Sequence, residues 1–243
     1  MRIIKLDAID STNSHLRKLY ANEIIDDYTA VLAKNQTLGR GQMGAGWNSE
    51  AYKNLTFSVF KDLSEFKLEE LFYVSMVTAL SVLKALDSFG IPKLSVKWPN
   101  DILSADKKIC GVLIENVIKQ GNFNASVIGI GLNVNQTAFE NLPKASSLKL
   151  ISGKTFDLDE LTITIINNLK DYFTLLKNEK YDIIKEEYER HLFRKNKPST
   201  FTDTEGLMFS GFIKSVTESG HLQVLLEDDV LKAFDLKEIT LLY

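Results

Sequence analysis

Residues 125–134 read Ala-Ser-Val-Ile-Gly-Ile-Gly-Leu-Asn-Val and decide the fold class of this chain. A strand built from this stretch would be apolar on both faces, which is typical of the centre of a sheet. Residues 68–89 carry apolar side chains at helical spacing and are followed by Gly90, so they predict an amphipathic helix. We therefore expect an α/β (α+β) fold, a mixed sheet flanked by helices, with 125–134 in the middle of the sheet.

Strand and helix patterns continue on both sides of this stretch. Strands are expected at 2–9, 28–34, 54–60, 94–98, 101–103 and 109–118. Helices are expected after the cap residues at 10–13, at 158–177 and at 182–193. The strand at 54–60 alternates apolar and hydroxyl side chains, which predicts one buried face.

The pattern changes after the basic run at 194–198. From there short β-like runs alternate with turns at 204–206, 218–220 and 227–229. About 50 residues of this kind suit a small barrel of short strands. We expect an α/β domain over 1–193 and a small all-β domain over 194–243.

Composition narrows the classes of protein. The chain has 243 residues, 44% of them hydrophobic, and a formal net charge of −3, which argues against a dedicated nucleic-acid-binding surface. No apolar run approaches the roughly 18 residues of a membrane helix. Cys110 is the single cysteine, so an internal disulfide is excluded. We expect a soluble, cytoplasmic protein with no membrane partner.

A glycine-rich loop precedes the strand expected at 54–60. Its letters, Gly39-Arg40-Gly41-Gln42-Met43-Gly44, match G-x-G-x-x-G. A dinucleotide-binding loop must open a helix, and here a strand comes next, so that interpretation fails. The Walker A and kinase interpretations fail because their other motifs are missing. A flexible surface connection and a functional loop both remain open at this point.

The run Lys97-Trp98-Pro99-Asn100-Asp101 combines a cation, an aromatic ring, a rigid corner, an amide and a carboxylate. Pro99 fixes the backbone, so Asn100 and Asp101 are presented at a defined bend. An amide and a carboxylate at a bend suit Mg²⁺ and nucleotide oxygens. An ordinary solvated turn explains these two residues but not the Trp-Pro pair beside a lysine.

Lys108 stands at the start of an apolar strand. By strand alternation it shares a face with Cys110 and Val112, and it is either an edge residue with its ammonium group in solvent or a working cation. Gly111 beside it permits close approach of a bulky group. Gly129 and Gly131, on one face of the central strand, leave room for a ligand; Asn133 either faces a site or ends the strand.

Together these motifs resemble those of the biotin protein ligases, in the family's order and from about residue 7 to residue 135. The segments that carry the resemblance are Asp10-Ser11-Thr12-Asn13, Gln36, Gly39-Arg40-Gly41, Trp47, Lys97-Trp98-Pro99-Asn100-Asp101, Lys108 with Gly111, and 129–133. The resemblance implies a class II synthetase-like ligase domain. Gly211, Gly220 and Glu238-Ile239 more weakly resemble the family's SH3-like C-terminal domain.

The resemblance implies a two-step reaction. The carboxylate of biotin attacks the α-phosphate of ATP, with Mg²⁺ on the phosphates, to give biotinyl-5'-adenylate and pyrophosphate. A lysine of a biotin carboxyl carrier domain then takes the biotinyl group and AMP leaves. The lysine implied between the two reacting anions is Lys108.

The same resemblance implies a role for each matching residue. The biotin-binding residues would be Ser11, Thr12, Asn13, Gln36, Gly39, Arg40, Gly41, Gln42, Lys108 and Gly111. The ATP-binding residues would be Trp47, Asn100, Asp101 and Asn133, with Asp101 near Mg²⁺ directly or through a phosphate. The catalytic residues would be Lys108, Arg40 and Asp101, and the loop would act as a lid.

Two departures from the family pattern matter. After Gly-Arg-Gly the loop has Gln42, Met43 and Ala45 where further arginines are common, so we expect weaker retention of the adenylate. The first expected strand starts at Arg2, which suggests a monofunctional ligase without a DNA-binding domain and without a DNA partner. A homodimer, a lipoate or octanoate ligase of the same fold, and a non-catalytic sensor stay open as alternatives.

Overall fold

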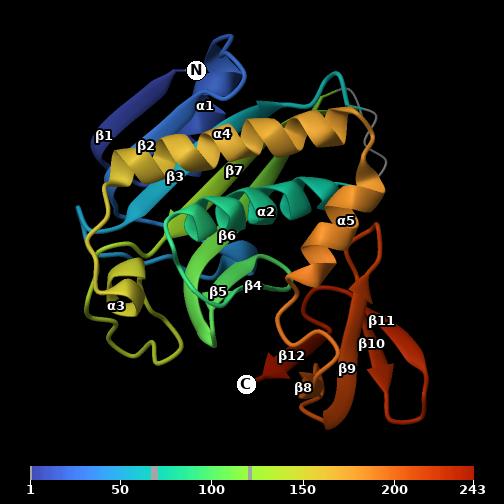
Figure 1. Ribbon diagram of the computed structural model, residues 1–243. Helices are drawn as coiled ribbons and strands as arrows, with labels where there is room; N and C mark the ends of the chain where they lie inside the picture. Colours follow the sequence, from blue (N-terminus) through green and yellow to red (C-terminus); the bar gives the residue numbers. More distant parts are fainter. Residues whose placement is uncertain (1, 67–70, 120–121) are drawn as a thin grey trace.

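Seven strands form the main sheet of the computed structural model, which describes residues 2–66, 71–119 and 122–243 (Figure 1). Their order is β1-β2-β3-β7-β6-β5-β4. The strands are β1 (Ile3–Ile9), β2 (Ala30–Gln36), β3 (Leu55–Asp62), β4 (Leu94–Lys97), β5 (Asp101–Ser104), β6 (Lys107–Lys119) and β7 (Asn122–Leu132). Only β1 and β2 pair in parallel, so the sheet is mixed as expected. The stretch expected at the centre is confirmed there, because β7 lies between β3 and β6.

Helices cover the sheet unequally. Figure 1 shows α2 (Phe72–Ser88) and α4 (Leu158–Lys177) side by side across one face, with α5 (Tyr181–Arg190) at the end of α2. The other face carries α1 (Thr12–Asn22), whose buried Leu16 packs in a small cluster with Val31, Phe60, Ala125 and Val127. Further along β7 on that face the apolar side chains give way to glycines. The face beside α1 is therefore the one with room for a site.

The expected helices are present with altered bounds. α4 has the expected bounds, whereas α5 ends at Arg190, before the expected 193. The helix expected at 68–89 is observed as Phe72–Ser88, and residues 67–70 lie outside the described residues. The short helix α3 (Leu148–Ser152), capped by Ser147, was not expected because five residues carry little periodic signal.

The prediction of one buried face for β3 is wrong. Seven of its eight residues are buried, since α1 covers the face that carries the hydroxyl side chains. These hydroxyls are satisfied internally: Thr56 donates to the carbonyl of Ala33 at 2.7 Å, and Ser58 donates to Asn13 at 2.5 Å. Buried polar groups are tolerated when they are hydrogen-bonded in this way.

A second, antiparallel sheet follows α5. Its strands are β8 (Pro198–Asp203), β9 (Met208–Val216), β10 (Leu222–Leu226), β11 (Leu231–Phe234) and β12 (Ile239–Leu242), in the order β11-β10-β9-β8-β12. This agrees with the expected SH3-like module of short strands. The Trp98 indole N–H donates to the carbonyl oxygen of Gly220 at 2.8 Å, which joins this sheet to the turn after β4. The boundary expected between 193 and 194 stays a prediction.

None of the helices in the described part of the chain is long and apolar enough to cross a bilayer.

The junction at Gly220 generates a stability prediction. Gly220 has φ +94°, and a Cβ there would lie 2.5 Å from a ring carbon of Phe72. We expect Gly220→Ala to cost about 1–3 kcal/mol through backbone strain and this clash, and to lower Tm by roughly 2–4 °C per kcal/mol. The matched control is Gly206→Ala, because Gly206 has φ +85° but open space around it. Equal losses in thermal denaturation would contradict the packing of Gly220 against Phe72.

Candidate active site

A cavity of about 220 Å³ lies on the α1 side of the sheet. The start of α1, the end of β2, the glycine loop and the strands β5, β6 and β7 contribute to its wall. Most of the residues singled out from the sequence meet here: Ser11, Thr12, Asn13, Gln36, Arg40, Gly41, Gln42, Trp47, Asn100, Asp101, Lys108 and Gly111. Segments far apart in the sequence therefore build one chamber.

Two of the expected site residues do not line this cavity. The Gly39 carbonyl accepts a 2.9 Å hydrogen bond from the backbone N–H of Trp47, so Gly39 closes the base of the glycine loop. Asn133 is buried and donates from Nδ2 to the carbonyl of Ser146 at 3.0 Å. Its side chain thus fixes the segment after β7, and a direct contact with a nucleotide stays a prediction.

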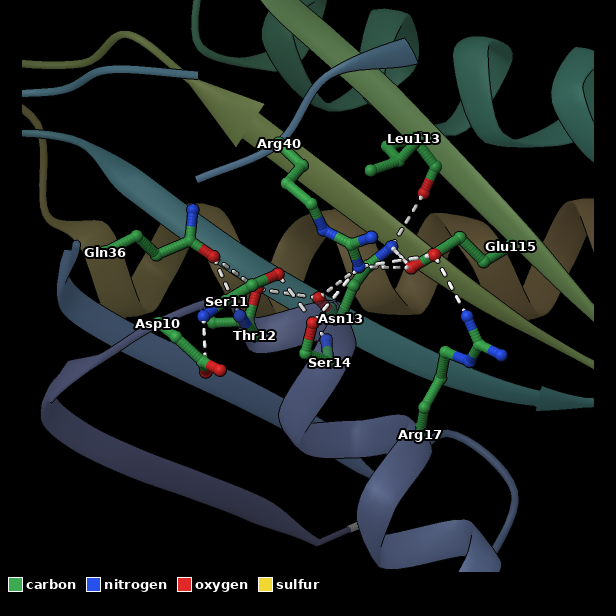
Figure 2. Close-up of polar contacts among 11 residues, drawn as sticks. Asp10, Ser11, Thr12, Asn13, Ser14, Arg17, Gln36, Arg40, Leu113 and Glu115 are labelled. Atoms are coloured by element: carbon green, nitrogen blue, oxygen red, sulfur yellow. Dashed lines mark hydrogen bonds and ion pairs between the residues drawn. The ribbon is translucent and has the colours of Figure 1, made fainter. Parts of the chain in front are cut away.

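A chain of polar side chains forms one end of the cavity (Figure 2). The backbone N–H and the hydroxyl of Thr12 donate to Gln36 Oε1 at 2.8 and 3.0 Å. The Asn13 amide accepts from Ser58 and donates to Glu115 Oε2 at 2.8 Å. Ser11 caps α1 by accepting from the N–H of Ser14. These contacts fix the amide and hydroxyl groups in one orientation before any ligand binds.

Glycines form the floor beneath these groups. Gly111 and Gly131 face each other across β6 and β7. A Cβ on Gly131 would lie 2.4 Å from Trp47 Cε2, and a Cβ on Gly129 would lie 2.4 Å from Asn13 Oδ1. The room expected for a ligand is thus partly filled by the protein's own Trp47 and Asn13. Only glycine allows these two side chains to lie directly against the sheet.

The other end of the cavity holds an ion pair. Lys108 Nζ lies 2.6 Å from Asp101 Oδ1, and their side chains are 35% and 17% exposed. The Asn100 amide donates to the Val112 carbonyl at 2.6 Å, and the Val112 N–H donates back to the Asn100 carbonyl at 3.0 Å. The bend that carries Asn100 and Asp101 is therefore fixed to β6, with Asp101 aimed at Lys108.

The prediction that Lys108 shares a strand face with Cys110 was wrong. A register shift in the β5–β6 pairing, between Ile102 and Leu103, interrupts the alternation. Lys108 therefore reaches Gly111 on the cavity side, whereas Cys110 is fully buried in the core under α2. Burial raises the pKa of the Cys110 thiol, which keeps it protonated and unreactive.

Lys97 adds a further cation beyond this ion pair. It lies opposite Asp101 in the β4–β5 pairing, and its ammonium group is 4.8 Å from the ring centroid of Tyr243. Burial lowers the pKa of Lys97; Asp101 opposes that shift, and the nearby cations Lys108 and Lys144 add to it. The Asp101 end of the cavity is therefore electropositive and suits a phosphate group.

The carboxylates present define how a magnesium ion could be held. Asp101 is the acidic side chain that lines the cavity, and the described residues contain no cluster of three His, Cys, Asp or Glu side chains suited to a metal. Mg²⁺ bound to a nucleotide commonly needs only one or two carboxylates, since phosphate oxygens and waters complete its shell. The donor set fits an ion that arrives with a polyphosphate.

Sequence reasoning missed Glu115 and Ser58. Glu115 pairs with Arg17 and Arg40, each at 3.2 Å, and bonds the Asn13 amide. The available signal was an acidic residue within the apolar run of β6. Glu115 lies two residues after Leu113 and four residues after Gly111. Ser58 gave no signal, because a serine in an alternating strand is normally read as solvent-facing.

Comparison with known proteins places this site in a family. The model of the biotin/lipoate A/B protein ligase family matches residues 6–133. The chain belongs to this family. The resemblance seen in the motifs is thereby confirmed, and the matched range contains the polar network, the glycine loop, Asp101 and Lys108.

Members of this ligase family resemble the chain in sequence and structure. The bifunctional ligase/repressor BirA of Bacillus spizizenii is 29% identical over 181 residues, covering 71% of this chain and 55% of that protein. The biotin–[acetyl-CoA-carboxylase] ligase of Mycobacterium tuberculosis is 29% identical over 163 residues, covering 66% and 59%. The chain thus aligns with little more than half the length of these relatives.

A solved structure agrees over the whole chain. Biotin protein ligase from Aquifex aeolicus, in complex with biotin and ATP, superposes with a TM-score of 0.83 and is 28% identical. The match covers 99% of this chain and 98% of that one. The expected ligase-type fold with its small C-terminal β domain is therefore confirmed.

The glycine floor of this ligase-family site generates a prediction for Trp47. Gly131→Ala should push the indole off the sheet and cost about 1–3 kcal/mol, as overpacking does. In a Trp98→Phe background Trp47 is the sole tryptophan, so the fluorescence reports on Trp47 alone. Because the indole is displaced from the sheet, its emission should shift to longer wavelength. Gly46→Ala, in the same loop with open space around it, is the control. An unshifted emission in the Gly131 variant would contradict the close packing of Trp47.

Proposed function

We propose that this chain is a biotin protein ligase. It activates biotin with ATP to biotinyl-5'-adenylate, releases pyrophosphate, and transfers biotin to a lysine of a biotin carboxyl carrier domain. The observation that carries the proposal is one continuous cavity with a fixed amide and hydroxyl network at one end and the Lys108–Asp101 ion pair at the other. The relative from Aquifex aeolicus, solved with biotin and ATP, supports the same pair of substrates.

The length of β6 supports two ligands in one line. Glu115 bounds the polar network, and the ammonium group of Lys108 reaches Gly111, which is four positions from Glu115 on the strand. Four residues of extended chain span roughly 13 Å, at about 3.3 Å each. That length suits a small bicyclic acid and a nucleotide phosphate placed end to end. The polar ring would lie by Thr12 and Asn13, and the carboxylate would point towards Lys108.

The first step must bring two anions together. A carboxylate oxygen of biotin attacks the α-phosphorus of ATP, the bond to the bridging oxygen of the β-phosphate breaks, and pyrophosphate leaves with that electron pair. Lys108 would lie between the carboxylate and the phosphate and offset their repulsion, because Asp101 holds its ammonium group in place. A pre-oriented cation is worth more here than a mobile one, since it does not reorganise during the reaction.

Mg²⁺ would be held by the triphosphate together with Asp101, and when bound it supplies charge neutralisation at the phosphates. Trp47 and Asn100 would contact the nucleotide from the glycine floor and from the bend before β5. The glycine loop would act as a lid that excludes water from the mixed anhydride. Weak retention of the adenylate by this arginine-poor lid stays a prediction.

The second step needs an acceptor amine. The lysine of the carrier attacks the acyl carbon of the adenylate and AMP leaves. The name of the Mycobacterium tuberculosis relative, a ligase of biotin to acetyl-CoA carboxylase, supports a biotin-dependent carboxylase as the source of the acceptor. Consumption of ATP fits the cytoplasmic location expected from the sequence. A homodimer stays open, and the absence of a DNA partner stays a prediction.

ATP–pyrophosphate exchange tests the proposal. Purified protein with Mg²⁺ should exchange label only when biotin is present, and parallel reactions with lipoate or octanoate should give none. Lys108→Ala should lower the exchange rate about 10²–10³-fold, as loss of a transition-state charge contact does, while biotin binding changes less than tenfold.

Lys107→Ala is the matched control, because Lys107 is the adjacent lysine and donates to the carbonyl of Pro143 outside the cavity. Exchange with lipoate or octanoate instead of biotin would reassign the chain to the other ligases of its family. Biotin binding without any exchange would make it a sensor.

A further inference from the structure

Glu115 is the most heavily engaged carboxylate beside the cavity (Figure 2). Its Oε2 accepts from Asn13 Nδ2 at 2.8 Å, its Oε1 lies 3.2 Å from Arg17 Nη1, and its Oε2 lies 3.2 Å from Arg40 Nη2. The side chain is 18% exposed, whereas the two arginines are about half exposed. One mostly buried carboxylate therefore has two cationic partners, one from α1 and one from the glycine loop.

Arg40 is tied to the network end of the cavity. Its Nη2 also donates to Ser14 Oγ at 3.1 Å, so the guanidinium bridges β6 and the first turn of α1. Figure 2 shows this group between Glu115 and Ser14. Lys108 lies seven residues before Glu115 on β6, and it pairs with Asp101 of the neighbouring strand β5. The charge of Arg40 is thus engaged away from the point where Lys108 acts.

We propose that Glu115 is a positioning residue that competes with the carboxylate of the substrate for Arg40. This inference rests on the proposed function, because biotin supplies the competing carboxylate. In the ligand-free protein Arg40 bonds Glu115 and Ser14. When biotin binds, Arg40 moves to its carboxylate, and Arg17 stays on Glu115.

Arg17 makes this exchange feasible. A carboxylate as buried as Glu115 would be costly if it lost its cationic partner. Arg17 and the Asn13 amide remain bonded to it after Arg40 leaves, so no unpaired charge is created. The affinity for biotin then depends on the fraction of molecules in which Arg40 is free to leave, because binding is weakened by the population of the non-competent state.

The competition predicts that different variants change the affinity for biotin in opposite directions. Glu115→Gln keeps an acceptor oxygen for Asn13 but removes the charge that holds Arg40, so biotin should bind more tightly. Ser14→Ala removes the other contact of Arg40 without touching Asn13, so it should act in the same direction with a smaller effect. Among the described residues, Arg17→Ala leaves Arg40 as the only cation within 4 Å of Glu115, so biotin should bind more weakly.

Calorimetric titration with biotin tests this prediction. We expect Kd to fall about two- to fivefold in Glu115→Gln and by less in Ser14→Ala, and to rise about two- to fivefold in Arg17→Ala, as for partly exposed ion pairs. Lys5→Ala is the control, since it removes an ion pair with Asp159 on the edge strand β1 and should leave Kd unchanged.

A purely structural role of Glu115 predicts a different result. All three substitutions near Arg40 would then weaken biotin binding together, and that outcome, or three unchanged affinities, would overturn the competition while leaving the proposed function intact. If Glu115→Gln does not fold, the opposite signs of Ser14→Ala and Arg17→Ala still decide. A wild-type protein that binds no biotin would overturn the proposed function, and the competition with it.

Discussion

The absence of side chains at Gly129 and Gly131 is the constraint on which the site depends. A methyl group at either position would come within 2.4 Å of Asn13 or Trp47, so both residues can lie on the sheet only because β7 carries glycine there. The same strand is the centre of the sheet, covered by α2 and α4 on its opposite face. The core therefore fixes the floor of the site, and the floor fixes the polar network and the loop above it.

The two ends of the cavity use different chemistry. At one end neutral amides and hydroxyls hold one another in place, which suits recognition of a polar ring without net charge. At the other end Lys108 and Asp101 form an ion pair, with Lys97 beyond it. Glu115 holds Arg40 at the network end, and in our proposal Arg40 leaves it for the carboxylate of biotin. A single strand, β6, carries both Glu115 and Lys108.

Much of this arrangement could be predicted from the sequence, for identifiable reasons. The central strand and α4 follow from hydrophobic patterns, and Asp101 and Lys108 come from motifs whose spacing is specific. The face of Lys108 was mispredicted because the register of β6 shifts at Ile109, opposite Ile102 and Leu103, and this shift leaves no periodic signal. Glu115 was missed because its partner Arg40, 75 residues away in the sequence, decides where its side chain points. For Asn133 the deciding partner is the carbonyl of Ser146 in the segment after β7.

The most direct test is a crystal structure with a non-hydrolysable analogue of biotinyl-adenylate. The expected result is that the bicyclic ring lies among Thr12, Asn13 and Gln36, that the phosphate lies within hydrogen-bond distance of Lys108 Nζ, and that Arg40 has left Glu115. A ligand bound elsewhere, for example in the cavity between α2, α4 and α5, would contradict it. So would a ligand in the described cavity with its phosphate remote from Lys108.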